Sequence, residues 1–182
     1  MKNRICETAT HLNNAWVAVQ TRVFYEKIVA EQLSFNEHEC FLPLRYKEPF
    51  KIVPDLKGTK EPTKVPLFPG YLFCRYKLNP IFHIRQASGV KKILCRNGIP
   101  EIIPDNEIES IQKIVNSGFH GKPCSLLKVG LKVRVHSGPF NGAEGYLVSV
   151  NKNKYKIAFG ISLIEQAIVV TVVGADVRTI NQ

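Results

Sequence analysis

The side chains in this sequence that can ligate a metal or act as nucleophiles are spread too widely to work together. The five histidines show no metal-ligand spacing, and they are His11, His38, His83, His120 and His136. The five cysteines include no CxxC pair, and they are Cys6, Cys40, Cys74, Cys95 and Cys124. The chain has no P-loop, HExxH motif or nucleophile elbow. We therefore expect reduced, mostly buried thiols and a protein that is not an enzyme, with no catalytic residue, metal or cofactor.

One closely spaced acid pair, Asp105 and Glu107, has both a catalytic and a structural interpretation. Pro104 stands just before the pair and suits the first position of a helix. Carboxylates at this point are stabilised by the positive end of the helix dipole. Apolar residues then recur at helical spacing as far as Val115. We therefore predict a helix that begins here and assign the two acids to its start.

The charge of the chain points to two kinds of surface. It contains 25 Lys and Arg residues against 15 Asp and Glu residues, which gives a net charge of +10 and a pI near 9.5. A surface of this kind attracts phosphate backbones, or it serves only solubility, and composition leaves both interpretations open. The most apolar stretch, residues 157–175, is interrupted by Glu165 and Gln166 and is rich in β-branched residues, which favours strands over a membrane helix. We expect a soluble cytoplasmic protein.

Residues 67–73 (LFPGYLF) combine aromatic rings with a Pro-Gly interruption of a strand. Pro69 fixes φ and Gly70 accepts backbone angles that other residues avoid, so the strand is expected to bend. The rings of Phe68 and Tyr71 then either fill the core around a bulge or stand at the sheet margin as anchors for a partner helix. The bend alone favours the bulge, because a bulge needs no partner.

Residues 133–145 (VRVHSGPFNGAEG) read as two strands around a glycine-rich turn. Gly138, Gly142 and Gly145 permit a tight reversal and a close approach of backbones. The spacing differs from GxGxxG and no helix follows, so a dinucleotide site is excluded.

Periodicity and turn residues divide the chain into two parts. The first part has predicted strands at 16–21, 40–46, 65–76 and 91–96, helices at 22–33, 80–86 and from 104, and a Pro- and Lys-rich loop at 47–64. In the helix at 22–33, Tyr25, Val29 and Leu33 share one face, and Glu26 and Lys27 lie mostly off it. After a predicted linker, short strands at 132–136, 145–150, 154–159 and 167–173 indicate a small barrel.

Taken together, these segments resemble the NusG family of transcription elongation factors. Residues 16–33, 65–76 and 88–115 follow the N-terminal (NGN) domain of that family, and residues 127–180 follow its C-terminal KOW domain. The KOW loop would comprise Gly138, Pro139, Phe140, Gly142 and Gly145. The resemblance implies an α+β protein with a ferredoxin-like α/β NGN domain and an all-β SH3-like KOW barrel. The implied boundaries are a tail at 1–14, the NGN domain at 15–116, a linker at 117–126 and the KOW domain at 127–182.

Within the family, the segments VPLFPGY (65–71) and IPD (103–105) resemble the specialised UpxY-type antiterminators, which act on surface-polysaccharide operons and are similar in role to RfaH. The alternatives are a general NusG elongation factor that couples to Rho or the ribosome and, from another class, a ribosomal-type KOW RNA-binding protein.

The resemblance also implies partners for a monomeric, non-membrane protein. Residues that would bind the clamp helices of the largest RNA polymerase subunit are Trp16, Phe41, Phe68, Pro69, Gly70 and Tyr71. Residues that would contact the non-template DNA strand are Arg22, Lys27, Arg85, Lys91 and Lys92. The KOW domain would recruit ribosomal protein S-ten or Rho, and its Val-, Ile- and Thr-rich strands predict a stable barrel.

Overall fold

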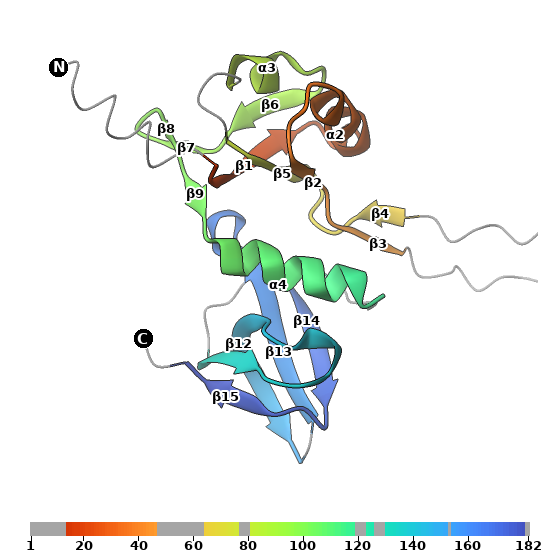
Figure 1. Ribbon diagram of the computed structural model, residues 1–182, viewed down its shortest axis with the longest axis vertical. Helices are drawn as coiled ribbons and strands as arrows, with labels where there is room; N and C mark the ends of the chain where they lie inside the picture. Colours follow the sequence, from red (N-terminus) through yellow and green to blue (C-terminus); the bar gives the residue numbers. More distant parts are fainter. Residues whose placement is uncertain are drawn as a thin grey trace, which may run out of the picture.

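The computed structural model describes residues 14–46, 64–76, 81–118, 123–125, 130–152 and 154–180. It contains an N-terminal part built on one sheet and a C-terminal part built on another, with a long helix between them (Figure 1). This arrangement confirms the predicted α+β class. Within the described ranges, no helix is long and apolar enough to cross a membrane.

The N-terminal sheet is antiparallel, with its longest strand at the centre. Its strands follow the order β2 (Cys40–Phe41), β5 (Tyr71–Arg75), β1 (Trp16–Thr21) and β6 (Val90–Ile93), and β9 (Ile102–Ile103) also pairs with β1. Its helices are α2 (Glu26–Phe35), α3 (Ile81–Gln86) and α4 (Asp105–Asn116). β1 is buried along almost its whole length, as expected for a strand that is covered on both faces.

One face of this sheet is closed by α2 and α3. Val17 and Val19 of β1 pack in one cluster with Val29 and Leu33 of α2 and with Ile84 of α3. The side chains of a strand alternate between its two faces, so Trp16 and Ala18 point the other way and belong to a second cluster. The predicted α2 stripe is confirmed at the two positions inside the helix.

The helix α2 begins later than predicted, at Glu26 instead of residue 22. Residues 22–25 form a turn in which the Tyr25 N–H donates to the carbonyl of Arg22 at 3.1 Å. Phe24 has a φ of 72°, which a helix cannot contain. Tyr25 is therefore the residue before the helix, and it is 36% exposed.

Two predicted strands are each divided. Residues 40–46 give β2 and β3 (Leu44–Tyr46), and residues 65–76 give β4 (Lys64–Pro66) and β5. β3 and β4 pair only with each other, as a two-stranded ribbon beside the sheet. The predicted loop at 47–64 lies outside the described residues, except for Lys64. The predicted Asn97–Gly98 turn is confirmed, since it joins β7 (Cys95–Arg96) to β8 (Ile99–Pro100), and both turn residues have positive φ, at 53° and 81°.

The C-terminal sheet contains the short strands that the sequence predicts. Its order is β10 (Pro123–Ser125), β14 (Gln166–Val173), β13 (Lys154–Ile161), β12 (Glu144–Asn151), β11 (Lys132–Val135) and β15 (Val177–Thr179). Two 3₁₀ turns, η1 (Gly138–Phe140) and η2 (Ser162–Ile164), connect strands. β10 falls within residues 117–126, the predicted linker, and pairs with β14 through Cys124 and Ala167. The predicted linker thus contributes a strand, because its backbone finds a partner at the sheet edge.

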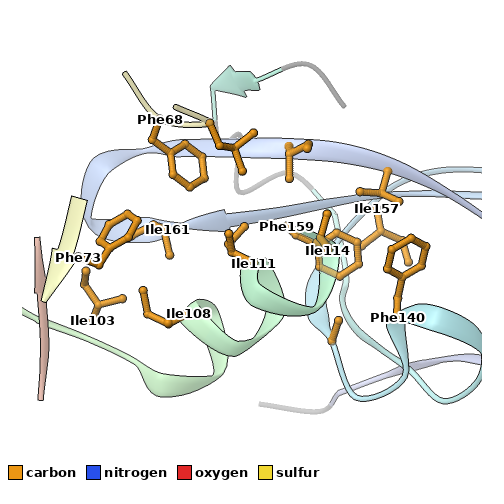
Figure 2. Packing of buried hydrophobic residues seen from close by; sticks show 14 of the residues in the cluster. Phe68, Phe73, Ile103, Ile108, Ile111, Ile114, Phe140, Ile157, Phe159 and Ile161 are labelled. Carbon is orange, nitrogen blue, oxygen red and sulfur yellow. The ribbon is translucent and has the colours of Figure 1, made fainter. Parts of the chain in front are cut away.

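The helix α4 joins the two parts into one core. Its buried side chains Ile108, Ile111 and Ile114 belong to the same cluster as Phe73 of the N-terminal sheet and Phe159 of the C-terminal sheet (Figure 2). Fully burying an isoleucine side chain stabilises a fold by about 2 kcal/mol. The two domains therefore share a hydrophobic core that is centred on α4.

Candidate functional site

The bend at residues 68–71 is a type II turn held from two sides. The Tyr71 N–H donates to the carbonyl of Phe68 at 3.1 Å, and Gly70 has a φ of 81°, which a type II turn requires at its third position. The Gly70 N–H donates to a carboxylate oxygen of Glu26 at 2.6 Å, and the Thr21 N–H donates to the Gly70 carbonyl at 2.8 Å. The end of β1 and the first turn of α2 thus fix the shape of this bend.

Glu26 is a functional candidate that the sequence analysis missed. Its position mostly off the apolar stripe of α2 predicted exposure, yet it is only 2% exposed. A buried carboxylate needs hydrogen-bond donors, and the N–H of Gly70 is one. An acid in the first turn of a helix was the available signal, but it does not reveal a partner 44 residues away.

The six predicted polymerase-binding residues lie on or beside one face of the N-terminal sheet, the face opposite α2 and α3. We call this face of the sheet, with the turn at residues 68–71, the docking face. The Phe73 ring at its centre lies 6.3 Å from that of Phe41 and 6.1 Å from that of Phe68, measured between centroids. Trp16 is 3% exposed and lies under the guanidinium of Arg75, 4.6 Å from the ring centroid. Trp16 belongs to the same apolar cluster as the three phenylalanine rings.

The docking face is not open to solvent along its whole length. Phe68 is 0% exposed and fills the core, so the interpretation of a partner-facing ring fails for Phe68 in this arrangement. Tyr71 is half-buried, with its hydroxyl 3.4 Å from the donating Nε2 of Gln20, and Pro69 is exposed. Figure 2 shows Phe68 and Phe73 with Ile161 of β13 at one end of the shared cluster. Part of the docking face is therefore covered by the C-terminal domain.

Polar contacts border this interface on α4. The Glu107 carboxylate accepts a hydrogen bond from the Ser162 N–H at 2.9 Å and another from the Ser162 hydroxyl at 2.7 Å. The Ser110 hydroxyl accepts from the Glu144 N–H at 2.9 Å. Glu107, predicted only as a helix-start acid, therefore also binds the C-terminal domain.

Glu144, within the glycine-rich segment, is the centre of the largest polar group at the interface. Its carboxylate accepts hydrogen bonds from Asn106 of α4 at 2.6 Å and from the Arg134 Nε at 3.0 Å, and Lys132 Nζ lies at 3.3 Å. Burial by itself raises the pKa of Glu144, but the hydrogen bonds from Arg134, Asn106 and Lys132 outweigh it and hold the pKa below its ordinary value. Glu144 is therefore a charged link between the C-terminal domain and α4.

The predicted KOW loop faces the same helix. Phe140 is 7% exposed and packs in the shared cluster, and a side chain on Gly142 would lie 2.7 Å from the Nζ of Lys113 on α4. Gly145 lies against β13, where a Cβ atom would be 2.6 Å from the carbonyl of Ala158. Gly138 and Pro139 are exposed. The loop thus contributes to the interdomain contact.

The five predicted nucleic-acid-binding residues are all exposed, but they do not share one face. Lys92 pairs across the strands with Gln20, so it lies on the side of the docking face, and Lys91 lies on the opposite side. The Lys27 Nζ donates to the carbonyl of Lys64 at 3.0 Å, which holds it against the β3–β4 ribbon. Within the described ranges none of the five forms an ion pair.

Comparison with known proteins decides the family. The family profile described as "Transcription termination factor nusG" matches residues 14–112, more than half of the chain. The chain belongs to the NusG family. A NusG transcription termination/antitermination protein of Borreliella burgdorferi is 24% identical over 84% of this chain and 91% of its own length. One from Pseudomonas aeruginosa is 27% identical over 80% of this chain and 87% of its own length.

A solved structure described as "Domain interaction in Thermotoga maritima NusG" shares the fold of this NusG-family chain. It has a TM-score of 0.51 and 19% identity, and the match covers 92% of this chain and 97% of that one. The predicted family and the predicted fold, an NGN domain followed by a C-terminal β domain, are confirmed. The chain is thus a transcription termination/antitermination factor of the NusG family.

Proposed function

We propose that this NusG-family protein binds the clamp helices of the largest RNA polymerase subunit through its docking face and suppresses pausing or termination. One observation supports the proposal above the others. The docking face carries the rings of Trp16, Phe41, Phe68 and Tyr71, and its outer turn, at residues 68–71, is fixed by Glu26 and Thr21. Aromatic anchors on a rigid support are typical of surfaces that bind a partner helix.

Binding of polymerase at this face competes with the C-terminal domain. Phe68 has no exposed surface while the two domains are in contact, so docking requires the barrel to move away from α4. The apparent affinity for polymerase then falls by the fraction of molecules that are open. Hydrogen bonds to charged groups such as Glu107 and Glu144 each stabilise the closed form by about 1.5–3 kcal/mol net, because water replaces them on opening.

The proposal extends to nucleic acid and to partners of the KOW loop. We propose that the exposed Arg22, Arg85, Lys91 and Lys92, together with Lys27, contact the phosphates of the non-template DNA strand, which would make binding salt-dependent. We further propose that the KOW loop meets ribosomal protein S-ten or Rho after release from α4, since Phe140 is covered in the closed form. In this proposal, residues 15–116 and 127–182 are the two functional units.

The proposed targets are specific operons, such as those for surface polysaccharides, as in UpxY-type antiterminators. Genome-wide polymerase occupancy with and without the protein tests this. Changes at one or a few loci are expected, whereas changes at most operons would indicate the general elongation factor. Co-purification with ribosomes in place of polymerase would indicate the ribosomal-type alternative.

The central experiment measures binding of the full-length chain to a clamp-helix fragment of polymerase. We expect Tyr71→Ala to lose binding because it removes a half-buried ring from the docking face. We expect Asn106→Ala to strengthen binding, because it removes one hydrogen bond to Glu144 and favours opening. Glu109→Ala is the matched control, an exposed residue on the same helix. Unchanged binding by a folded Tyr71→Ala protein would rule out this docking face.

A further inference from the structure

Phe24 is a large aromatic residue in a strained and exposed position. It is 89% exposed, and its φ of 72° lies in the left-handed region that favours glycine. It occupies the third position of the turn from Arg22 to Tyr25, which is closed by a 3.1 Å hydrogen bond between those two residues. Strain of this kind persists only where the surroundings fix it, and it is common at sites that bind something.

The neighbouring structure does fix this turn. The Arg22 N–H donates to the carbonyl of Gly89 at 2.8 Å, and the ring of Tyr25 lies so close to Gly89 that a Cβ there would be 2.6 Å from it. Just before and just after this turn, Thr21 and Glu26 form hydrogen bonds with Gly70 of the other turn, at residues 68–71. The ring of Phe24 is therefore carried by a rigid support between the docking face and β6.

The turn at residues 22–25 and the strand β6 carry exposed cations and no exposed acid. Arg22 is exposed two residues before Phe24, and Lys91 and Lys92 are exposed on β6, just after Gly89. The acid that follows the turn, Glu26, is 2% exposed and bonded to Gly70. An exposed ring on a segment that carries cations suits single-stranded nucleic acid, because unpaired bases stack on aromatic rings and phosphates meet the cations.

We propose that Phe24 is a stacking platform for an unpaired base of single-stranded nucleic acid, with Arg22 and Lys91 contacting the adjacent phosphates. This inference rests on the proposed function only in identifying the nucleic acid, which would be the single strand exposed in a transcription complex. A protein partner would use the nearby apolar side chains Val23 and Ile28 instead, and the test below separates the two.

The experiment measures binding of the full-length chain to a labelled single-stranded DNA of about twelve nucleotides, within the usual site size. Loss of one stacked base predicts that Phe24→Gly weakens binding by about 5- to 150-fold. Because glycine relieves the strained φ, the thermal midpoint of this variant is expected to stay unchanged or rise. Phe24→Trp is expected to retain binding. The same oligonucleotide as RNA or as a duplex shows which strand type is preferred, and the loss is expected only for unpaired strands.

Phe35 provides a matched control, since it is also 89% exposed and lies at the other end of α2. Phe35→Ala should leave nucleic-acid binding unchanged. Unchanged binding by Phe24→Gly, or an equal loss in Phe35→Ala, overturns the proposal. Loss of clamp-helix binding by Phe24→Gly with normal DNA binding also overturns it and assigns the ring to a protein partner. Tyr71→Ala should keep DNA binding, so a failure of the docking proposal is distinguishable from a failure of this one.

Discussion

The two faces of the N-terminal sheet are covered in different ways. The face under α2 and α3 is closed by apolar residues of the same domain, such as Val29, Leu33 and Ile84. The opposite face is closed by α4 and the C-terminal barrel, and polar pairs such as Glu107–Ser162 border that contact. Both contacts are apolar, but the first joins elements of one domain, whereas the second also joins two domains, so we expect it to open without unfolding of either domain. We call the first the permanent face and the second, which the proposed docking would uncover, the exchangeable face.

The largest expected effect concerns the permanent face. Leu33→Ala removes a fully buried side chain between α2 and the sheet, and we expect it to lower the free energy of unfolding by about 2–5 kcal/mol. Chemical denaturation measures this, with the exposed Glu31→Ala as control. If Leu33→Ala lowers the free energy of unfolding by less than about 1 kcal/mol, the contact between α2 and the sheet is no more important for stability than an exposed residue.

A smaller loss of stability is expected where α2 meets the docking face, at the hydrogen bond between Glu26 and Gly70. Glu26→Ala leaves the buried N–H of Gly70 without its acceptor, which is expected to cost about 1–3 kcal/mol and to weaken clamp-helix binding. Glu26→Gln keeps an acceptor oxygen and should restore most of both. Denaturation and fragment binding are measured in parallel. If the Glu26→Ala protein binds the clamp-helix fragment normally, the shape of the turn at residues 68–71 does not depend on this carboxylate.

The exchangeable face is expected to open in acid. The pKa of Glu144 is lowered in the folded protein, so its contribution to the closed form is complete above the ordinary glutamate pKa. It is lost as the pH falls through the lowered value. Trp16, the one tryptophan of the chain, lies in the shared cluster and reports the opening through its fluorescence emission. Glu144→Gln should make the closed form weaker by about 1 kcal/mol and remove this pH dependence. If the Glu144→Gln protein shows the same change of fluorescence in acid, another titrating group causes the opening.

The smallest effect sharpens the distinction between the faces. Burial, together with the neighbouring Cys40, raises the pKa of the Cys74 thiol, and Cys74 lies in the permanent core. We expect slow alkylation of Cys74 and fast alkylation of the exposed Cys95, as followed by peptide mass spectrometry. Glu144→Gln should leave the Cys74 rate unchanged, since opening the other face does not uncover it. Acceleration in that variant would show that the two faces open together.

Local patterns in the sequence determined the elements and their type. The spacing of Val29 and Leu33 predicted α2, Pro104 predicted the start of α4, and Asn97–Gly98 predicted a hairpin turn. These features depend on neighbours along the chain, through backbone angles and periodicity, and are therefore visible in the sequence itself. The start of α2 was missed because Phe24 adopts a φ that glycine usually takes, which no rule based on residue type anticipates.

Only the tertiary structure decided which surfaces meet. Cys40 and Cys74, scattered in the sequence, lie opposite each other on β2 and β5 with sulfur atoms 2.7 Å apart. The ring of Phe68 is buried in the cluster that the two domains share, whereas its segment favoured a core-filling bulge and also allowed an exposed anchor. Such contacts join residues far apart in the chain, and their free energy depends on partners that a local pattern does not contain. The sequence by itself therefore determined the two domains and the family, and the packing against α4 determined how much of the docking face is exposed.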